Sequence, residues 1–100
     1  MSYNTKYELP FDLDRYFNRT PNAIEVPLTE IVPGTPHAIE AAGRFMRQAY
    51  DGKRSKRDPI TLIPRERGGY KCKDGNSTLA NAIANQWPTI LAVVENDNEL

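Results

Sequence analysis

The sequence predicts a small α+β domain in which two main helices pack against a mixed sheet of about four strands. Apolar residues recur at helical spacing over Pro36–Tyr50 and again after Ser77, whereas Ile60–Ile63 and Tyr70–Lys73 alternate in the manner of strands. The chain has 100 residues, of which 39% are hydrophobic and 26% are charged. That composition is typical of one folded domain with a single core.

The N-terminal segment, residues 1–22, combines aromatic rings with charged side chains. Its rings are those of Tyr3, Tyr7, Phe11, Tyr16 and Phe17. Because Leu13, Tyr16 and Phe17 lie at helical spacing, we expect a helix of about two turns from Asp12, ended by Thr20-Pro21. A small domain needs such rings in its own core, which favours packing on the domain over an arm that binds a partner chain.

Three elements are expected in residues 23–50. Ala23–Val26 is typical of a short strand, and Leu28–Val32 of a turn of helix. Thr35 is the expected N-cap of a helix over Pro36–Tyr50, since proline is favoured at the first helical position. The residues of this helix that we expect to be buried are Ala38, Ile39, Ala42, Phe45, Met46 and Ala49.

The second half of the chain is expected to form a hairpin and a final strand. Ile60–Ile63 and Tyr70–Lys73 are joined by Pro64–Gly69, a long charged link that we expect to be mobile and to lie over the site. Thr89–Val94 is apolar along its length, which predicts a central strand. Glu95–Leu100 is an acidic tail of a composition that favours disorder.

The turn between the hairpin and the next helix is the strongest candidate site. Asp74-Gly75 is a turn signal, and Asn76 or Ser77 is the expected N-cap. A helix start offers unpaired N–H groups and the positive end of the helix dipole, so Gly75, Asn76, Ser77 and Thr78 form a candidate phosphate cradle. The alternative is that these residues cap the helix and hold no ligand.

Three single residues have a functional and a structural interpretation, and the structural one is favoured. His37 has no second histidine or cysteine at ligand spacing, so we expect a solvated side chain and no metal site. Cys72 alternates with Tyr70 and is expected in the core. Trp87 ends the apolar stripe of the second helix, which favours a core position over stacking on a nucleic-acid base.

The formal net charge of zero hides an uneven distribution. Ten of the 13 basic residues lie between Arg44 and Lys73 with three acids, so this middle third carries a charge of +7. Patches of this kind bind phosphate backbones without choosing a base sequence. The candidate nucleic-acid-binding residues are Lys53, Arg54, Lys56, Arg57, Arg65, Arg67 and Lys73. The alternative is that the loop of residues 53–57 is a solvated connection.

Three segments resemble the ParB/sulfiredoxin superfamily. Tyr70–Val94 is similar to its core, in which a strand ends in Asp-Gly and is followed by a helix and a short strand. Ile24–Pro36 is similar to its opening segment, and Arg57–Tyr70 to its middle hairpin. The resemblance covers residues 23–94 and implies a ParB-like domain whose turn meets a nucleotide or a nucleic acid.

The turn departs from the superfamily pattern at two positions. ParB-like proteins that handle nucleotides carry Gly-x-x-Arg here, and Thr78 stands in place of the arginine. A hydroxyl does not supply the charge or the bidentate geometry of a guanidinium. The reactive cysteine of sulfiredoxins would stand at the position of Asn76, whereas Cys72 precedes the turn.

The leading hypothesis from the sequence is a nucleic-acid-associated module that binds the phosphate of DNA or of a nucleotide. The second is a nucleotide-dependent enzyme of the same fold, which would be a nuclease, a nucleotide hydrolase or a small-molecule kinase with Mg²⁺. Its candidate catalytic acids are Glu30, Glu66 and Asp74, although Asp74 can equally fix the turn by its own hydrogen bonds. The third is a protein-interaction factor with a decayed phosphate site.

Cysteine usage and hydropathy bear on where the protein acts. The single cysteine excludes an intramolecular disulfide and is typical of a reducing compartment. No apolar run reaches the ~18 residues that a membrane span needs. We therefore expect a cytoplasmic protein without a membrane partner.

Overall fold

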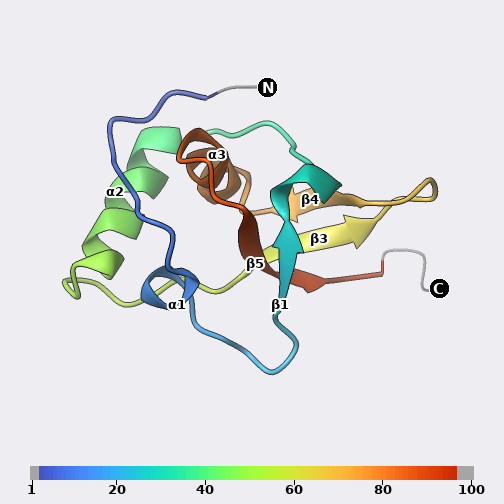
Figure 1. Ribbon diagram of the computed structural model, residues 1–100, viewed down its shortest axis with the longest axis horizontal. Coiled ribbons are helices and arrows are strands. Elements are labelled where there is room, and N and C mark those ends of the chain that lie inside the picture. Colours follow the sequence, from blue (N-terminus) through green and yellow to red (C-terminus); the bar gives the residue numbers. More distant parts are fainter. Residues whose placement is uncertain (1–2, 97–100) are drawn as a thin grey trace.

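The computed structural model describes residues 3–96 and is an α+β domain built on one five-stranded mixed sheet (Figure 1). The strands are β1 (Ile24–Pro27), β2 (Ile31–Val32), β3 (Ile60–Pro64), β4 (Tyr70–Asp74) and β5 (Thr89–Val94). The helices are α1 (Leu13–Tyr16), α2 (Ile39–Tyr50) and α3 (Asn76–Ala84), with the 3-10 turn η1 (Leu28–Glu30) between β1 and β2.

The predicted fold class is confirmed, with one strand more than expected. β2 consists of Ile31 and Val32, which pair in parallel with Tyr70 and Lys71 of β4. Two residues are too few to show the alternation by which a strand is recognised in a sequence. The turn of helix expected over Leu28–Val32 is therefore η1 followed by a short strand.

The order of the strands is β1-β5-β3-β4-β2. β5 pairs with a neighbour on each side, which confirms the expected central strand. The two edge strands, β1 and β2, are joined only by η1, and the four Cα steps of this link span at most about 14 Å. A flat sheet of five strands would hold its edges about 19 Å apart, so the sheet must curl into a half-barrel.

The N-terminal segment runs beside α2 before it reaches α1 (Figure 1). Leu9 N donates to Asn85 Oδ1 at 2.9 Å, and Leu9 O accepts a hydrogen bond from Trp87 Nε1 at 2.8 Å. Arg47 Nη1 donates to Glu8 O at 3.1 Å. Side chains of α2 and of the segment after α3 therefore hold the N-terminal segment on the domain.

Aromatic side chains of this segment complete the core. Tyr16 and Phe17 are buried and pack against Trp87, whose ring centre lies 4.8 Å from that of Tyr16. The core positions expected for these three residues are confirmed. α1 has one turn instead of the expected two, because Phe17 is already extended and pairs with Arg57. Phe11 remains exposed.

α2 and α3 pack closely because a glycine lies at their contact. A Cβ added to Gly43 would lie 2.7 Å from both Asn81 Oδ1 and Tyr7 Cδ2, which is closer than side chains pack. Asn81 is fully buried, and its Nδ2 donates to Ile39 O at 2.8 Å and to Ser77 O at 2.9 Å. These bonds fix the first turns of the two helices relative to each other.

The start of α2 differs from the prediction. The helix begins at Ile39, its N-cap is Ala38, and no side chain of the described residues caps it, so the expectation that Thr35 is the cap is wrong. Ala38 is exposed and does not belong to the buried stripe. The buried residues of α2 are Ala42, Gly43, Met46 and Ala49. Ile39 and Phe45 are half-buried.

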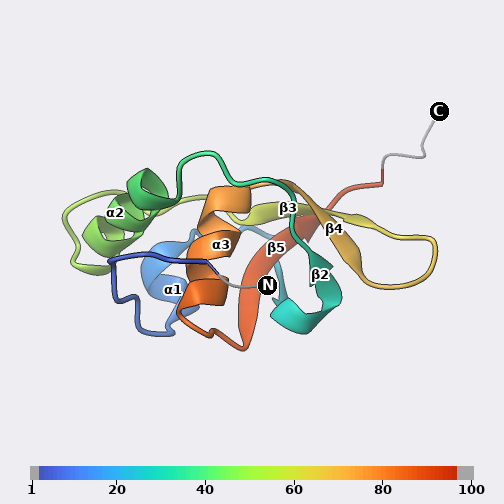
Figure 2. The ribbon, with the colours of Figure 1, turned by 90° about the horizontal axis from the view of Figure 1, so that it is seen from above.

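The hairpin of β3 and β4 projects at the end of the domain opposite α2 (Figure 2). Its link, Pro64–Gly69, therefore lies away from that helix. Cys72 on β4 is 2% exposed, which confirms the expected core position. Of the acidic tail, residues 97–100 lie outside the described residues. Among residues 3–96, no helix is both long enough and apolar enough to cross a membrane.

Candidate phosphate-binding site

A cavity of about 420 Å³ lies between the first turns of α2 and α3. α2 and the segment before it contribute Thr35, His37, Ala38, Ala41, Ala42 and Phe45. The end of β4 and the start of α3 contribute Lys73, Asp74, Gly75, Asn76, Ser77 and Thr78, and Arg57 comes from the loop before β3. All four residues of the predicted cradle therefore line one cavity.

Gly75 sets the direction in which α3 starts. It is the N-cap residue and has a φ of +95°, in the left-handed region that favours glycine. A Cβ at this position would also lie 2.6 Å from Ile60 Cγ2. The helix begins with a hydrogen bond from Leu79 N to Gly75 O at 2.9 Å, so the N–H groups of residues 76–78 have no acceptor within residues 3–96.

The expectation that Asn76 or Ser77 caps α3 is wrong, because both side chains bind another segment. Asn76 Oδ1 accepts a hydrogen bond from Gly34 N at 2.7 Å. Ser77 Oγ accepts hydrogen bonds from His37 N at 3.1 Å and from Ala38 N at 2.9 Å. The two side chains thus attach the segment before α2 to the start of α3, a role that no local sequence pattern indicates.

The cavity therefore lies at the N-terminal ends of two helices. In α2 the first helical bond runs from Ala42 N to Ala38 O at 2.9 Å, and the N–H groups of residues 39–41 have no acceptor in the described part of the chain. The unpaired N–H groups and dipoles of both helices place partial positive charge here. Sequence reasoning predicted the α3 end alone, because the approach of α2 depends on tertiary packing.

Thr78 is a buried polar residue at this site. Its exposed fraction is 4%, and it lines both the cavity and an adjoining one of about 210 Å³. Among residues 3–96, the Thr78 hydroxyl has no hydrogen-bond partner. Among residues 3–96, the fully buried side-chain atoms without a hydrogen-bond partner are Thr20 Oγ1 and Asn81 Oδ1, so the Thr78 hydroxyl is reached from the cavity and can bind a ligand there.

Two of the seven predicted nucleic-acid-binding residues, Arg57 and Lys73, line the cavity. Lys73 Nζ also pairs with Glu95 Oε1 at 3.0 Å, so its charge is partly neutralised. A third, Arg54, lies over the ring of Phe45, with its guanidinium carbon 3.6 Å from the ring centre. Because Phe45 lines the cavity, Arg54 contacts the cavity wall without lining the cavity itself.

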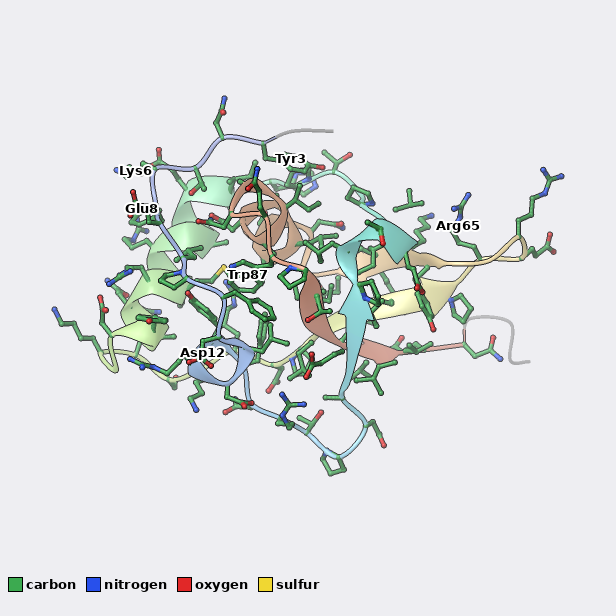
Figure 3. All side chains as sticks on the ribbon, in the orientation of Figure 1. Tyr3, Lys6, Glu8, Asp12, Arg65 and Trp87 are labelled. Atoms are coloured by element: carbon green, nitrogen blue, oxygen red, sulfur yellow. The ribbon has the colours of Figure 1, made fainter. Side chains whose placement is uncertain are left out.

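The other four predicted residues are exposed at two ends of the molecule. Lys53 and Lys56 lie in the loop that follows α2. Arg65 and Arg67 lie in the link between β3 and β4, toward the other end of the longest dimension of 40 Å (Figure 3). The basic middle third therefore does not form one continuous patch, because the hairpin carries its second half away from the loop.

Of the three predicted catalytic acids, Asp74 alone lines the cavity; it also lines the smaller one, together with Asp58. Glu30 ends η1 and Glu66 lies in the link between β3 and β4, and neither lines either cavity. Within residues 3–96, no group of three or more His, Cys, Asp or Glu side chains could hold a metal ion. The structure thus brings one of the three acids to the predicted cradle.

Cys72 lies just before the turn, and its thiol is not activated. Burial raises its pKa from the ordinary value of 9.0 to about 11, and the charge of Asp74 adds to this effect. A hydrogen bond with the backbone of Asp74 lowers the pKa by less than burial raises it. The thiol itself donates to Asp74 O at 3.4 Å, which favours its protonated form. A thiol with this pKa stays protonated near neutral pH, so Cys72 is not a nucleophile.

Comparison with known proteins adds no assignment. A scan against protein-family models and a search of the curated proteins find no match for this chain. The likeness to the ParB/sulfiredoxin superfamily therefore stays a prediction.

Proposed function

We propose that this protein binds a phosphate group, carried by a nucleic acid or a nucleotide, in the cavity between α2 and α3. The observation that carries the proposal is the meeting of two helix starts, whose N–H groups lack acceptors within residues 3–96, with the unpaired hydroxyl of Thr78 at one cavity. Phosphate oxygens accept several hydrogen bonds at once, and their negative charge is stabilised at helix N-termini. Arg57 adds a full positive charge, and Lys73 adds one that Glu95 partly neutralises.

A nucleic acid is the favoured carrier because an exposed basic loop lies beside the cavity. Lys53 precedes Arg54, and Lys56 follows it, while Arg54 contacts Phe45 on the cavity wall. A strand with one phosphate in the cavity would bring neighbouring phosphates to these lysines, which would bind them without choosing a base sequence. Such a role agrees with the cytoplasmic location expected from the single cysteine.

The likeness to the ParB/sulfiredoxin superfamily supports the same proposal, since the corresponding turn of that superfamily meets nucleotides. The cavity lacks most of the predicted catalytic set. Glu30 and Glu66 lie away from the cavity, and the thiol of Cys72 is held in its protonated form. Asp74 is the single member of the predicted catalytic set at the cavity.

The proposal is tested by NMR titration of ¹⁵N-labelled protein with a short single-stranded oligonucleotide, a nucleoside monophosphate and inorganic phosphate. We expect the amide signals of residues 76–78 and 39–41 to move with each ligand, because these N–H groups would gain an acceptor. If none of the three ligands moves these signals at low salt, the proposal is wrong.

Two charge-reversal variants separate a nucleic acid from a free nucleotide. Lys53→Glu/Lys56→Glu changes the charge beside the cavity, and Arg65→Glu/Arg67→Glu makes the same change at the other end of the domain. We expect the first pair to weaken oligonucleotide binding. The slope of log K against the logarithm of the salt concentration should become shallower by about 0.7 for each lost phosphate contact. The second pair should have little effect on either. If both pairs weaken oligonucleotide binding equally, the proposal that a nucleic acid binds at the loop after α2 is contradicted. Oligonucleotide binding unchanged by the first pair would indicate a free nucleotide instead.

A further inference from the structure

We infer that Arg57 supplies the guanidinium that holds the phosphate in this cavity, in a position set by the N-terminal segment and by Phe45. The inference rests on the proposed function and adds the residue that gives the site its preference for phosphate. Arg57 lines both the larger and the smaller cavity, although it belongs to a different segment from the turn at Gly75.

The backbone of Arg57 is held by residues at the end of α1. Arg57 N donates to Tyr16 O at 2.9 Å, and Asn18 N donates to Arg57 O at 2.8 Å, as part of a parallel bridge between Phe17 and Arg57. Tyr16 and Phe17 are themselves buried in the core. The backbone of Arg57 is thus anchored to the core, whereas residues 53–56 before it are exposed.

The ring of Phe45 orients the Arg57 side chain. The guanidinium carbon of Arg57 lies 5.2 Å from the ring centre, within the range of a cation–π contact. Arg54 lies over the same ring, but its Nε donates to Gln48 Oε1 at 2.9 Å and it lines neither cavity. In the described part of the chain, the guanidinium of Arg57 makes no ion pair with a carboxylate. Arg57 therefore lines the cavity with a charge that no ion pair within residues 3–96 neutralises.

A full positive charge is what the turn itself lacks. The N–H groups and the hydroxyl of Thr78 offer directional hydrogen bonds without a whole charge, and Lys73 is paired with Glu95. A guanidinium adds two parallel N–H groups that match two oxygen atoms of a phosphate. Asp74 lines both cavities and Asp58 lines the smaller one as well, so the larger cavity has one carboxylate and the smaller one has two, which favours an anion in the larger cavity.

The test measures the dissociation constant of inorganic phosphate by NMR titration for the wild-type protein and three variants. Arg57→Gln should weaken binding about tenfold or more, because it removes the charge-assisted hydrogen bonds. Arg57→Lys should weaken binding less, since it keeps the charge and loses the bidentate geometry. Arg54→Gln is the matched control, because Arg54 contacts the same Phe45 ring but does not line the cavity. The phosphate affinity of this variant should stay within about twofold of wild type.

The outcomes separate this inference from the proposed function. If Arg57→Gln binds phosphate within about twofold of wild type, the inference is overturned and the proposed function stands. If the wild-type protein binds none of inorganic phosphate, the nucleoside monophosphate and the oligonucleotide, both are overturned. If it binds the oligonucleotide but not inorganic phosphate, the same comparison of variants is made with the oligonucleotide. The amide spectra recorded before phosphate is added show whether each variant is folded. If Arg57→Gln is not folded, Arg57→Lys decides: weaker binding supports the inference and unchanged binding overturns it.

Discussion

Replacement of Gly75 by alanine tests whether the start of α3 is packed against β3. Gly75 has a φ of +95°, and an added Cβ would lie 2.6 Å from Ile60 Cγ2 and 3.0 Å from Ile60 Cβ. Ile60 is 3% exposed and belongs to the core, so it cannot move aside without disturbing its neighbours. Gly75→Ala therefore adds two separate penalties, one in the backbone and one in packing.

The two penalties can be estimated separately. A left-handed backbone costs alanine about 1 kcal/mol more than glycine. A methyl group forced into a packed core costs about 1–3 kcal/mol. We therefore expect Gly75→Ala to lower the free energy of unfolding by about 2–4 kcal/mol, a large part of the ~5–15 kcal/mol typical of a small domain.

Gly68→Ala is the matched control, because Gly68 has a φ of +100° and an added Cβ there would meet no atom of residues 3–96 within 4 Å. It carries the backbone penalty alone, so we expect a loss of about 1 kcal/mol. Urea denaturation of the wild type and the two variants measures both losses. If the losses agree within about 0.5 kcal/mol, the close contact with Ile60 does not exist and the reasoning about the turn fails.

Two further predictions concern the turn and the strand before it. Asn76→Ala should lower the free energy of unfolding by about 1–3 kcal/mol, because Gly34 N–H loses its acceptor. Asn76→Asp keeps that acceptor and should keep most of the stability while weakening phosphate binding by its charge; equal stability losses in urea denaturation would contradict this. The pKa of Cys72 is raised from 9.0 to about 11, because the folded protein favours the protonated thiol. The stability that the buried, protonated thiol contributes is therefore complete below pH 9 and is lost as the pH rises through 11. Relative to Cys72→Ala, the free energy of unfolding should fall by up to about 1.4 kcal/mol per pH unit in that interval, and a constant difference would refute the assignment.

The turn at the centre of the candidate site is readable in the sequence because its determinants are local. Asp74-Gly75 followed by polar residues and an apolar stripe predicts a turn and a helix start, and the structure has α3 beginning at Asn76. The partners of the turn residues are not local. Asn76 and Ser77 look like caps in any sequence. In the structure, however, Asn76 accepts a hydrogen bond from Gly34 N, 42 positions away, and Ser77 accepts one from Ala38 N, 39 positions away.

The positions of the basic residues also could not be predicted from the local sequence. Arg57 and Arg65 belong to one run of positive charge, and nothing in their sequence surroundings separates them. In the structure Arg57 is pinned to the segment around α1 and lines the cavity, whereas Arg65 lies in the hairpin link away from α2. The two arginines are separated because β3 lies between them and runs away from the loop that contains Arg57.

The sequence by itself determined the α+β class, the main helices and strands and the aromatic residues of the core, because each depends on the spacing and hydrophobicity of neighbouring residues. The tertiary structure decided which N–H groups lack acceptors within residues 3–96, which basic residues line the cavity with them, and which acids lie elsewhere. These properties depend on distances between segments that only the packing of α2 against α3 and the curl of the sheet bring together.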